Sequence, residues 1–231
     1  MGTCAAGGEG DAGQMGDNTR FAWIIDDSLP RSEALWDREI LRTERFVAVP
    51  SAGSLVAGWT LLVPRRPMLN LSQTDASERG ELDEIALQIA DKLARIGQEV
   101  FFFEHGSRAK GSLTGCGVDQ AHLHVVPLPF DLVAAALARP DAGIAWRAAR
   151  DTAPPFDALP KDGEYVALWS RGDRRPMIGE VIQPVSQWLR RVIADELGIG
   201  AQWDYRKHPQ PTQVRETLDL LRPVAAIATT R

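Results

Sequence analysis

The sequence contains 231 residues, 44 % of them hydrophobic and 25 % charged, with a formal net charge of −5. This is the composition of a globular chain with one domain and an extension or two small domains, and the negative charge excludes a general binder of nucleic acid polymers. No apolar run approaches the roughly 18 residues of a membrane span, so we expect no membrane partner. No charged segment followed by an apolar one opens the chain, so we expect a cytoplasmic location.

The first part of the chain predicts a disordered leader and then a hairpin. Residues 1–19 are rich in Gly, Ala and Asp and have little to bury, so we expect disorder there. Residues 21–25 favour an apolar strand or a docking segment, and residues 32–40 favour a short helix. Residues 46–50 and 58–63 read as two strands around a turn, which predicts an antiparallel hairpin.

The clearest predicted helix spans residues 74–96. Thr74, Asp75 or Ser77 can cap its start, and Gly97 can end it. Its apolar side chains recur at steps of three and four, which places them on one face: Leu82, Ile85, Ile89, Leu93 and Ile96. We expect this face to pack against a sheet that includes a short apolar strand at residues 100–103.

The most informative stretch is residues 115–127, which carries two of the four histidines. Side chains two residues apart on a strand share a face, so Gln120, His122 and His124 would line one face and apolar side chains the other. A long connection with glycines at positions 106, 111, 115 and 117 precedes this strand. Glycines let backbone N–H groups approach a phosphate closely, although they also serve in ordinary turns.

Three roles are open to these imidazoles. One histidine could attack an electrophilic phosphorus and form a covalent intermediate, because a neutral imidazole is a nucleophile as well as a base. The pair could instead hold a metal with His105 or Asp119 as a further ligand, although no Cys/His cluster of metal spacing lies nearby. In the third role they are hydrogen-bonded polar groups on a solvated strand.

The rest of the chain predicts a smaller C-terminal unit. Residues 131–149 are helix-prone but interrupted by a proline, and the proline-rich residues 152–162 are the best candidate linker. A strand follows at residues 165–169, with helices at residues 184–197 and 212–221. The predicted units are a leader at 1–19, a domain at 20–150 and a C-terminal strand-helix extension at 151–231 packed on that domain.

Residues 203–208 are the most chemically dense part of this extension. An aromatic side chain there could stack on a base while Arg206 binds phosphate. In the alternative interpretation, these aromatic residues pack against the sheet and the charges stay in water.

Residues 120–126 (QAHLHVV) resemble the His-x-His-x-His-x-x signature of the histidine triad (HIT) superfamily, which comprises nucleotidyl hydrolases and transferases. Residues 58–67 (GWTLLVPRRP) resemble the family's Gly-aromatic-x-Leu-x-x-Pro-Lys-x-His segment. Residues 103–106 (FEHG) resemble the strand end that precedes its Gly-rich loop. The resemblance covers about residues 44–130, and the histidine motif is its specific part.

By this resemblance, His122 is the nucleophile that takes the nucleotidyl group, and His124 is a phosphate-binding partner. Gln120 stands where the family has its first histidine, and a glutamine can donate to a phosphate oxygen but cannot carry a proton. Pro67 is a second departure, because that position often holds a histidine. Residues 115–118 read GCGV where many members have Gly-Gln-Ser/Thr-Val. The expected substrate-binding residues are His105, Gly115, Cys116, Gly117 and Arg66.

The resemblance implies an α+β fold with a HIT-like antiparallel sheet and packed helices, and a homodimer in which two sheets join. It implies nucleotidyl hydrolysis or transfer at the α-phosphate of a nucleotide of the dinucleoside polyphosphate or nucleoside phosphoramidate type, without a cofactor or metal. A backbone carbonyl would hold the other ring nitrogen of His122 and fix its tautomer. Two alternatives stay open, which are a nucleotide-binding protein without turnover and a metal-dependent hydrolase.

Overall fold

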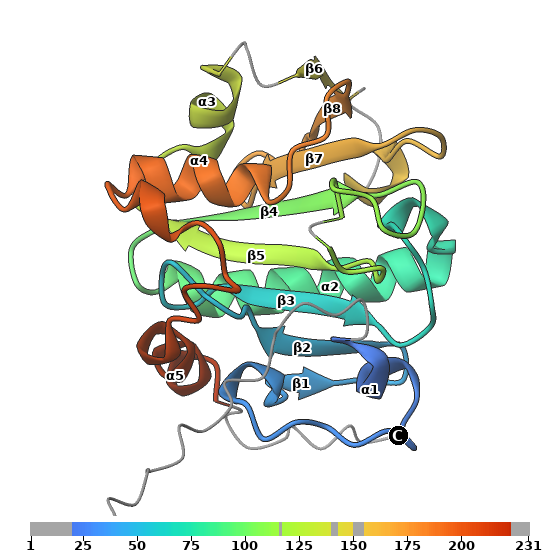
Figure 1. Cartoon of the computed structure of the whole chain (residues 1–231), viewed down its shortest axis with the longest axis vertical. Coiled ribbons are helices and arrows are strands. Elements are labelled where there is room, and N and C mark those ends of the chain that lie inside the picture. The colour runs from blue at the N-terminus through green and yellow to red at the C-terminus, as the bar shows by residue number, and fades with distance from the viewer. Residues whose placement is uncertain (1–19, 116, 140–142, 150–154, 223–231) are drawn as a thin grey trace, which may run out of the picture.

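The computed structural model describes residues 20–115, 117–139, 143–149 and 155–222, so the expected disorder of residues 1–19 lies outside it. Its centre is one eight-stranded sheet in the order β1-β2-β3-β5-β4-β7-β8-β6, antiparallel throughout, which confirms the α+β class (Figure 1). The strands are β1 (Leu41–Arg42), β2 (Phe46–Pro50), β3 (Thr60–Pro64), β4 (Glu99–Gly106), β5 (Leu123–Leu128), β6 (Ile144–Ala148), β7 (Tyr165–Ser170) and β8 (Met177–Val181). The α-helices are α1 (Ala22–Ile25), α2 (Ala76–Ala94), α3 (Leu132–Leu137), α4 (Trp188–Glu196) and α5 (Pro211–Leu220).

Helix α2 forms where the sequence predicts the clearest helix. The Asp75 carboxylate accepts the Glu78 N–H at 2.8 Å, and the Glu78 carboxylate accepts the Asp75 N–H at 2.8 Å. This reciprocal capping box satisfies two backbone donors at the start of the helix. The apolar stripe from Leu82 to Leu93 is buried against the sheet. Ile96, predicted as part of the stripe, lies beyond the helix and is 43 % exposed.

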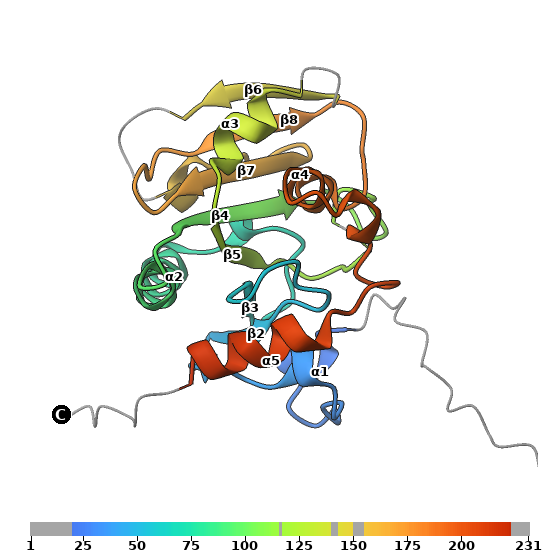
Figure 2. The same ribbon diagram turned by 90° about the vertical axis from the view of Figure 1, so that its left-hand side faces the viewer.

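Successive residues of β4 and β5 point to opposite faces of the sheet and feed two separate apolar cores. Phe102 belongs to the core beside α2, whereas Phe103 and Val126 belong to the core beside α4. Figure 2 shows α2 on one side of the sheet and α4 on the other. His105 and His124 stand two residues from Phe103 and Val126 along their strands, so both lie on the α4 side.

Two of the three expectations for the early segments needed correction. The predicted hairpin is confirmed, since β2 and β3 pair with Ala48 opposite Leu62. Residues 21–25, expected as a strand or docking segment, form the short helix α1. Of the helix expected at residues 32–40, only a single 3-10 turn is formed, at Leu35–Asp37.

The C-terminal part of the chain extends the same sheet. Strand β7 pairs along β4, and β8 pairs with both β7 and β6. At this end of the sheet, β6, which precedes position 150, therefore lies beside β8, which follows it (Figure 1). The sequence did not predict strands β6 and β8. Of the helix-prone residues 131–149, Leu132–Leu137 form the helix α3, and Ile144–Ala148 form the strand β6 instead. The predicted strand and the two C-terminal helices are present as β7, α4 and α5.

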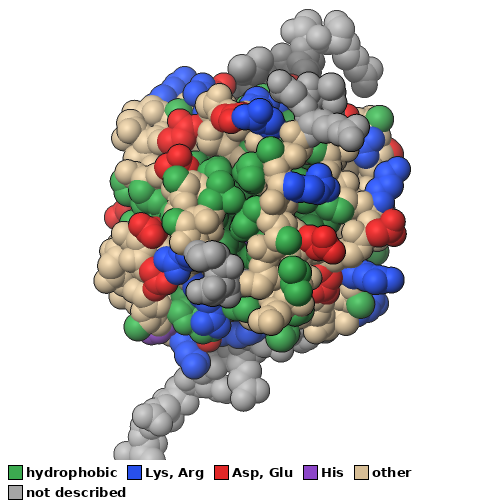
Figure 3. Space-filling model, turned by 90° about the horizontal axis from the view of Figure 1, so that it is seen from above, with side chains coloured by type: hydrophobic (Ala, Val, Ile, Leu, Met, Phe, Trp, Pro, Cys, Tyr) green, Lys and Arg blue, Asp and Glu red, His purple; other side chains and the backbone are tan. Residues whose placement is uncertain are grey.

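The end of the molecule that carries α3, β6 and β8 shows an apolar furrow. Hydrophobic side chains gather across this face, and charged side chains of both signs surround them (Figure 3). Ile182, directly after β8, is 67 % exposed.

None of the helices in the described ranges is long and apolar enough to cross a membrane.

Candidate active site

Three of the four histidines meet in one cavity on the α4 side of the sheet. His105 lies in β4 near its end, His124 lies in β5, and His122 stands just before β5. The ring centroids of His122 and His124 are 4.8 Å apart, and those of His105 and His124 are 6.1 Å apart. We call this space the imidazole cavity; the polar and aromatic residues that line it also include Arg20, Phe21, Arg190 and Tyr205.

The hydrogen bonding of His122 fixes its tautomer. Its Nδ1 lies 2.9 Å from the carbonyl oxygen of Gln120, so Nδ1 carries the hydrogen and donates to that carbonyl. Burial lowers the pKa of His122 to about 4, and the charge of Arg20 also lowers it, so the ring is neutral near pH 7. The Nε2 atom therefore keeps a free electron pair, and the backbone carbonyl expected from the sequence is supplied by Gln120.

His124 has the opposite tautomer. The indole Nε1 of Trp59 donates to Nδ1 of His124 at 3.0 Å, so the hydrogen of the neutral ring is on Nε2. The ring also stacks on Phe103, with centroids 4.2 Å apart and an angle of 12° between planes. Burial holds the pKa of His124 well below its usual value, and the neighbouring imidazoles and Arg190 lower it further. His124 is thus a rigidly held, neutral hydrogen-bond donor.

His105 connects the cavity to helix α4. Its Nε2 accepts the backbone N–H of Leu189 at 3.4 Å, which leaves the hydrogen on Nδ1. That Nδ1 is buried and has no hydrogen-bond partner among the described residues. Burial lowers the pKa of His105 to about 3, with smaller contributions from His122 and Arg190, so this ring is neutral as well.

The C-terminal extension contributes two residues to the cavity that were not predicted as site residues. Arg190 in α4 is 3 % exposed and donates to the carbonyl oxygens of Trp203 at 3.0 Å and Gly53 at 2.5 Å. Its guanidinium also lies 4.8 Å from the ring centroid of Trp59. Tyr205 belongs to the segment flagged as chemically dense, but Arg190 reads in the sequence as an ordinary helix charge. No local signal marks it, because its burial depends on how α4 docks.

The N-terminal segment forms another wall of the cavity. The ring of Phe21 lies 5.7 Å from the ring of His122, and Arg20 lines the cavity beside it. The remaining free volume is about 20 Å³, which is room for one water-sized group. Sites that hold small-molecule ligands usually enclose about 300–1,000 Å³. A nucleotide can therefore reach His122 only after part of a wall moves.

Gln120 and Arg66, both expected at the site, are engaged elsewhere. The Gln120 amide nitrogen donates to the carbonyls of Pro64 and Arg66, each at 2.9 Å, and its oxygen accepts the Met68 N–H at 3.2 Å. It fastens the 64–68 backbone and does not line the imidazole cavity. The Arg66 side chain is paired with Glu78 at the start of α2.

The loop before β5 meets the cavity through Val118 rather than through the expected glycines. Gly117 has φ +75°, and a Cβ there would meet the Arg206 side chain at 2.1 Å. A Cβ on Gly115 would approach the Ser107 hydroxyl at 2.9 Å. The two glycines thus permit close packing of this loop, while Cys116 lies outside the described residues.

The metal alternative lacks a ligand set in the described part of the chain. No group of three or more His, Cys, Asp or Glu residues is placed there to hold a metal ion. Each imidazole of the cavity instead has one ring nitrogen hydrogen-bonded within the protein.

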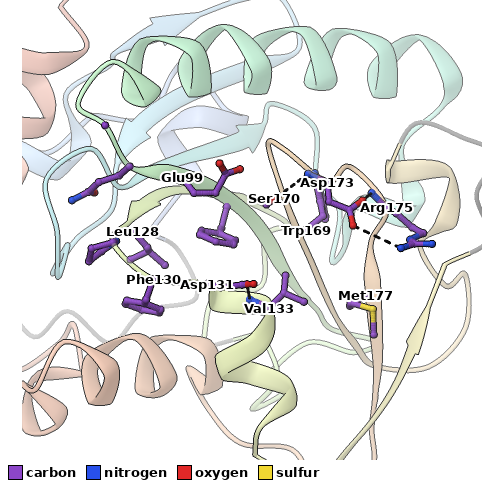
Figure 4. A pocket seen from close by; sticks show the side chains of 14 residues that line it. Glu99, Leu128, Phe130, Asp131, Val133, Trp169, Ser170, Asp173, Arg175 and Met177 are labelled. Carbon is purple, nitrogen blue, oxygen red and sulfur yellow. Dashed lines mark hydrogen bonds and ion pairs between the residues drawn. The ribbon is translucent and has the colours of Figure 1, made fainter.

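A larger cavity of about 560 Å³ lies at the opposite ends of β4 and β5 (Figure 4). Its apolar lining includes Phe101, Leu128 and Met177, and its rim carries carboxylates such as Glu99 and Asp131. Both carboxylates already accept backbone N–H groups, from Gly172 and from the first turn of α3. No imidazole lines it, so the chemistry of the triad-like motif belongs to the imidazole cavity.

Comparison with known proteins gives matches among solved structures. No family model and no curated protein sequence matches the chain. A HIT-like protein involved in cell-cycle regulation from Bartonella henselae is 19 % identical with a TM-score of 0.37, covering 48 % of this chain and 76 % of that one. A hypothetical histidine triad nucleotide-binding protein from Sulfolobus tokodaii is 22 % identical with a TM-score of 0.34, covering 48 % and 70 %.

Ap4A phosphorylase from yeast, in complex with Ap4A, is 9 % identical with a TM-score of 0.39 and covers 77 % of this chain and 74 % of that one. The matches thus include proteins described as HIT-like, the family that the histidine motif resembles.

Proposed function

We propose that the protein is a nucleotidyl hydrolase or transferase that acts at the α-phosphate of a nucleotide through a covalent intermediate on His122. The observation that supports this most directly is the bond between His122 Nδ1 and the Gln120 carbonyl. It leaves Nε2 unprotonated in a neutral ring, which is the form of imidazole that attacks phosphorus. The resemblance of residues 120–126 to the histidine triad signature assigns the same residue.

The proposed reaction has two displacements at phosphorus. The Nε2 electron pair of His122 forms a bond to the α-phosphorus, and the bond from phosphorus to the leaving-group oxygen breaks with its electrons on that oxygen. The ring becomes a positively charged nucleotidyl-imidazolium, whose Nδ1–H still donates to Gln120 and so disperses the charge. Water or another hydroxyl acceptor then attacks phosphorus and loses its proton to solvent, the P–N bond breaks with its electrons on Nε2, and the ring returns to its neutral form.

The lining residues favour a leaving group that departs as an anion. His105 and His124 are neutral because burial lowers the pKa of each. Neither is an imidazolium that could act as a general acid and protonate a departing amine. They are hydrogen-bond donors to phosphate oxygens through Nδ1 and Nε2 respectively. A polyphosphate leaves as a stable anion without a proton, so a dinucleoside polyphosphate fits better than a phosphoramidate.

Product analysis by liquid chromatography tests this function. Wild type, His122→Ala and His208→Ala are incubated with adenosine phosphoramidate, diadenosine polyphosphates and nucleotide sugars. His208 is the fourth histidine and does not line the cavity, so it is a matched control. Nucleoside monophosphate from wild type and His208→Ala, but not from His122→Ala, is the expected result. Equal release by all three proteins would overturn the role of His122.

Nucleotide binding without turnover is the second candidate. It is favoured by the engagement of the Gln120 amide with the backbone, because the residue at the first position of the histidine motif then does not reach the imidazole cavity. In this case none of the substrates releases a product, whereas AMP still binds to wild type in isothermal titration calorimetry.

A further inference from the structure

Arg20 brings an unsatisfied pair of hydrogen-bond donors to the wall of the imidazole cavity. Its Nε and Nη2 atoms are shielded from solvent, and neither has a hydrogen-bond partner among the described residues. These two nitrogens stand on the same edge of the planar guanidinium, where their N–H bonds point in parallel. Buried polar groups without a partner are uncommon, so this edge is available for an acceptor that the protein itself does not supply.

Arg66 shows in the same molecule what this edge of a guanidinium binds. Its Nε donates to Glu78 Oε1 at 2.6 Å, and its Nη2 donates to Oε2 of the same carboxylate at 2.8 Å. Two oxygens on one central atom match the two parallel N–H groups, and a phosphate presents the same arrangement. The corresponding edge of Arg20 is therefore a two-pronged site for an oxyanion.

The surroundings of Arg20 also favour an anion. His105 Nδ1 is a further buried donor without a partner in the described chain, and it lines the same cavity. Among the described residues that line the cavity there is no carboxylate, whereas there are two guanidiniums, those of Arg20 and Arg190. Asp37 acts on Arg20 through its charge, but no ion pair joins the two among the described residues.

We propose that Arg20 is a substrate-binding residue that holds two phosphate oxygens of the nucleotide through Nε and Nη2, so the N-terminal segment forms part of the site. This inference rests on the proposed function for the identity of the anion. It assigns to Arg20 the phosphate contact that the Gln120 amide, engaged with the backbone, does not make. Phe21, the next residue, lies against His122. The residue that would bind the phosphate and the residue that forms the wall beside His122 are therefore neighbours in the chain.

Isothermal titration calorimetry with AMP, adenosine and inorganic phosphate tests the inference. The proteins are wild type, Arg20→Met, Arg20→Lys and Arg31→Met. Arg31 is a matched control, because it lies over Trp23 near the same segment but does not line the cavity. Circular dichroism melting shows whether each variant is folded, and Arg20→Lys keeps the charge but loses the two-pronged geometry.

We expect Arg20→Met to weaken AMP binding about 10-fold or more, which is the usual effect of losing a charge-assisted pair of hydrogen bonds. Arg20→Lys should lie between Arg20→Met and wild type, Arg31→Met should match wild type, and any binding of adenosine should be unchanged. AMP affinity that is equal in wild type and a folded Arg20→Met protein would overturn the inference.

The outcomes separate this inference from the function on which it rests. If Arg20→Met keeps its AMP affinity while His122→Ala loses turnover, the function stands and the role of Arg20 is wrong. If no substrate is turned over but phosphate binds in an Arg20-dependent way, the anion site stands and the proposed reaction is wrong. If wild type binds neither AMP nor phosphate, the buried donors hold water only and the inference fails.

Discussion

Burial determines the protonation of the three cavity histidines. An imidazolium loses hydration when it is buried, so the pKa falls to about 4 for His122 and about 3 for His105, and lies well below the usual value for His124. Arg20 and Arg190 add to this effect because a cation disfavours a second cation nearby. The cavity thus presents the nitrogen atoms of three neutral imidazoles.

The pH dependence of the reaction follows from the lowered pKa of His122. In the proposed reaction the neutral ring is the nucleophile, so we expect activity above the pKa and its loss as the pH falls through about 4. We expect kcat/KM with a diadenosine polyphosphate to be flat from about pH 6 to 8, in contrast to an exposed histidine with a pKa near 6.5. A loss of half the activity between pH 6 and 7, with circular dichroism showing an intact fold, would contradict this.

The sequence could reveal some site residues because their placement is local. His124 in β5 and His122 just before it face the same side by two-residue spacing alone, and the neighbouring Leu123 and Val125 enter the other core as expected. Arg20 could not be found in this way, because its place depends on folding across a distance of about 100 residues in the chain. The destination of the Gln120 amide likewise depends on where the 64–68 backbone lies.

At the level of elements, a buried carboxyl ties β4 to its neighbours on the α2 side of the sheet. Glu104 accepts the Tyr165 hydroxyl at 2.6 Å and the Leu71 N–H at 2.6 Å. Burial raises its pKa to about 8, and the two hydrogen bonds oppose this rise. Near neutral pH the carboxyl is protonated in the folded protein and ionised in the unfolded chain.

This difference predicts how Glu104→Gln changes stability with pH. The pKa of Glu104 is about 8 in the folded protein, and its reference value, taken for the unfolded chain, is 4.5. The free energy of unfolding of the wild type therefore falls as the pH rises between these two values, by up to about 1.4 kcal/mol per pH unit. The Glu104→Gln protein has no titratable group at position 104. Both proteins contain the same histidines, so the contributions of the histidines cancel in the difference. The Tm of Glu104→Gln relative to wild type should therefore rise from pH 5 to pH 8. A difference that stays constant with pH would show that the Glu104 pKa is not raised, and Glu180→Gln, at an exposed glutamate, is the control substitution.

Elements with a strong local pattern were predictable, and those that depend on distant partners were not. The α2 stripe and its Asp75 cap are contained in one stretch of about 20 residues, and the β2–β3 hairpin needs one turn. Strands β6 and β8 are five residues each, and they pair across about 30 residues of chain, with Ala148 opposite Met177. No short turn joins β6 to β8, so the sequence holds no hairpin signal for this pair.

For the whole molecule, β1 and β6 are the edge strands of the sheet that the described residues form, while the outer side of β4 is covered by β7 of the same chain. The homodimer implied by the resemblance, in which two sheets join, would have to use one of these two edges. The five-residue β6 offers more backbone donors and acceptors than the two-residue β1.

Light scattering after size-exclusion chromatography tests the homodimer. We expect a mass of twice 25.3 kDa that is kept on dilution through the low micromolar range. A mass of 25.3 kDa at every concentration would show that the chain acts alone, with the imidazole cavity built from one copy.

The measurement that tests the covalent role of His122 most directly is the intact mass of the protein quenched within milliseconds of mixing with a diadenosine polyphosphate. We expect wild type and His208→Ala to gain one adenylyl group, a peptide containing residue 122 to carry it, and His122→Ala to gain none. Release of nucleoside monophosphate by wild type with no adduct at any quench time, or the same adduct on His122→Ala, would contradict a covalent intermediate at His122.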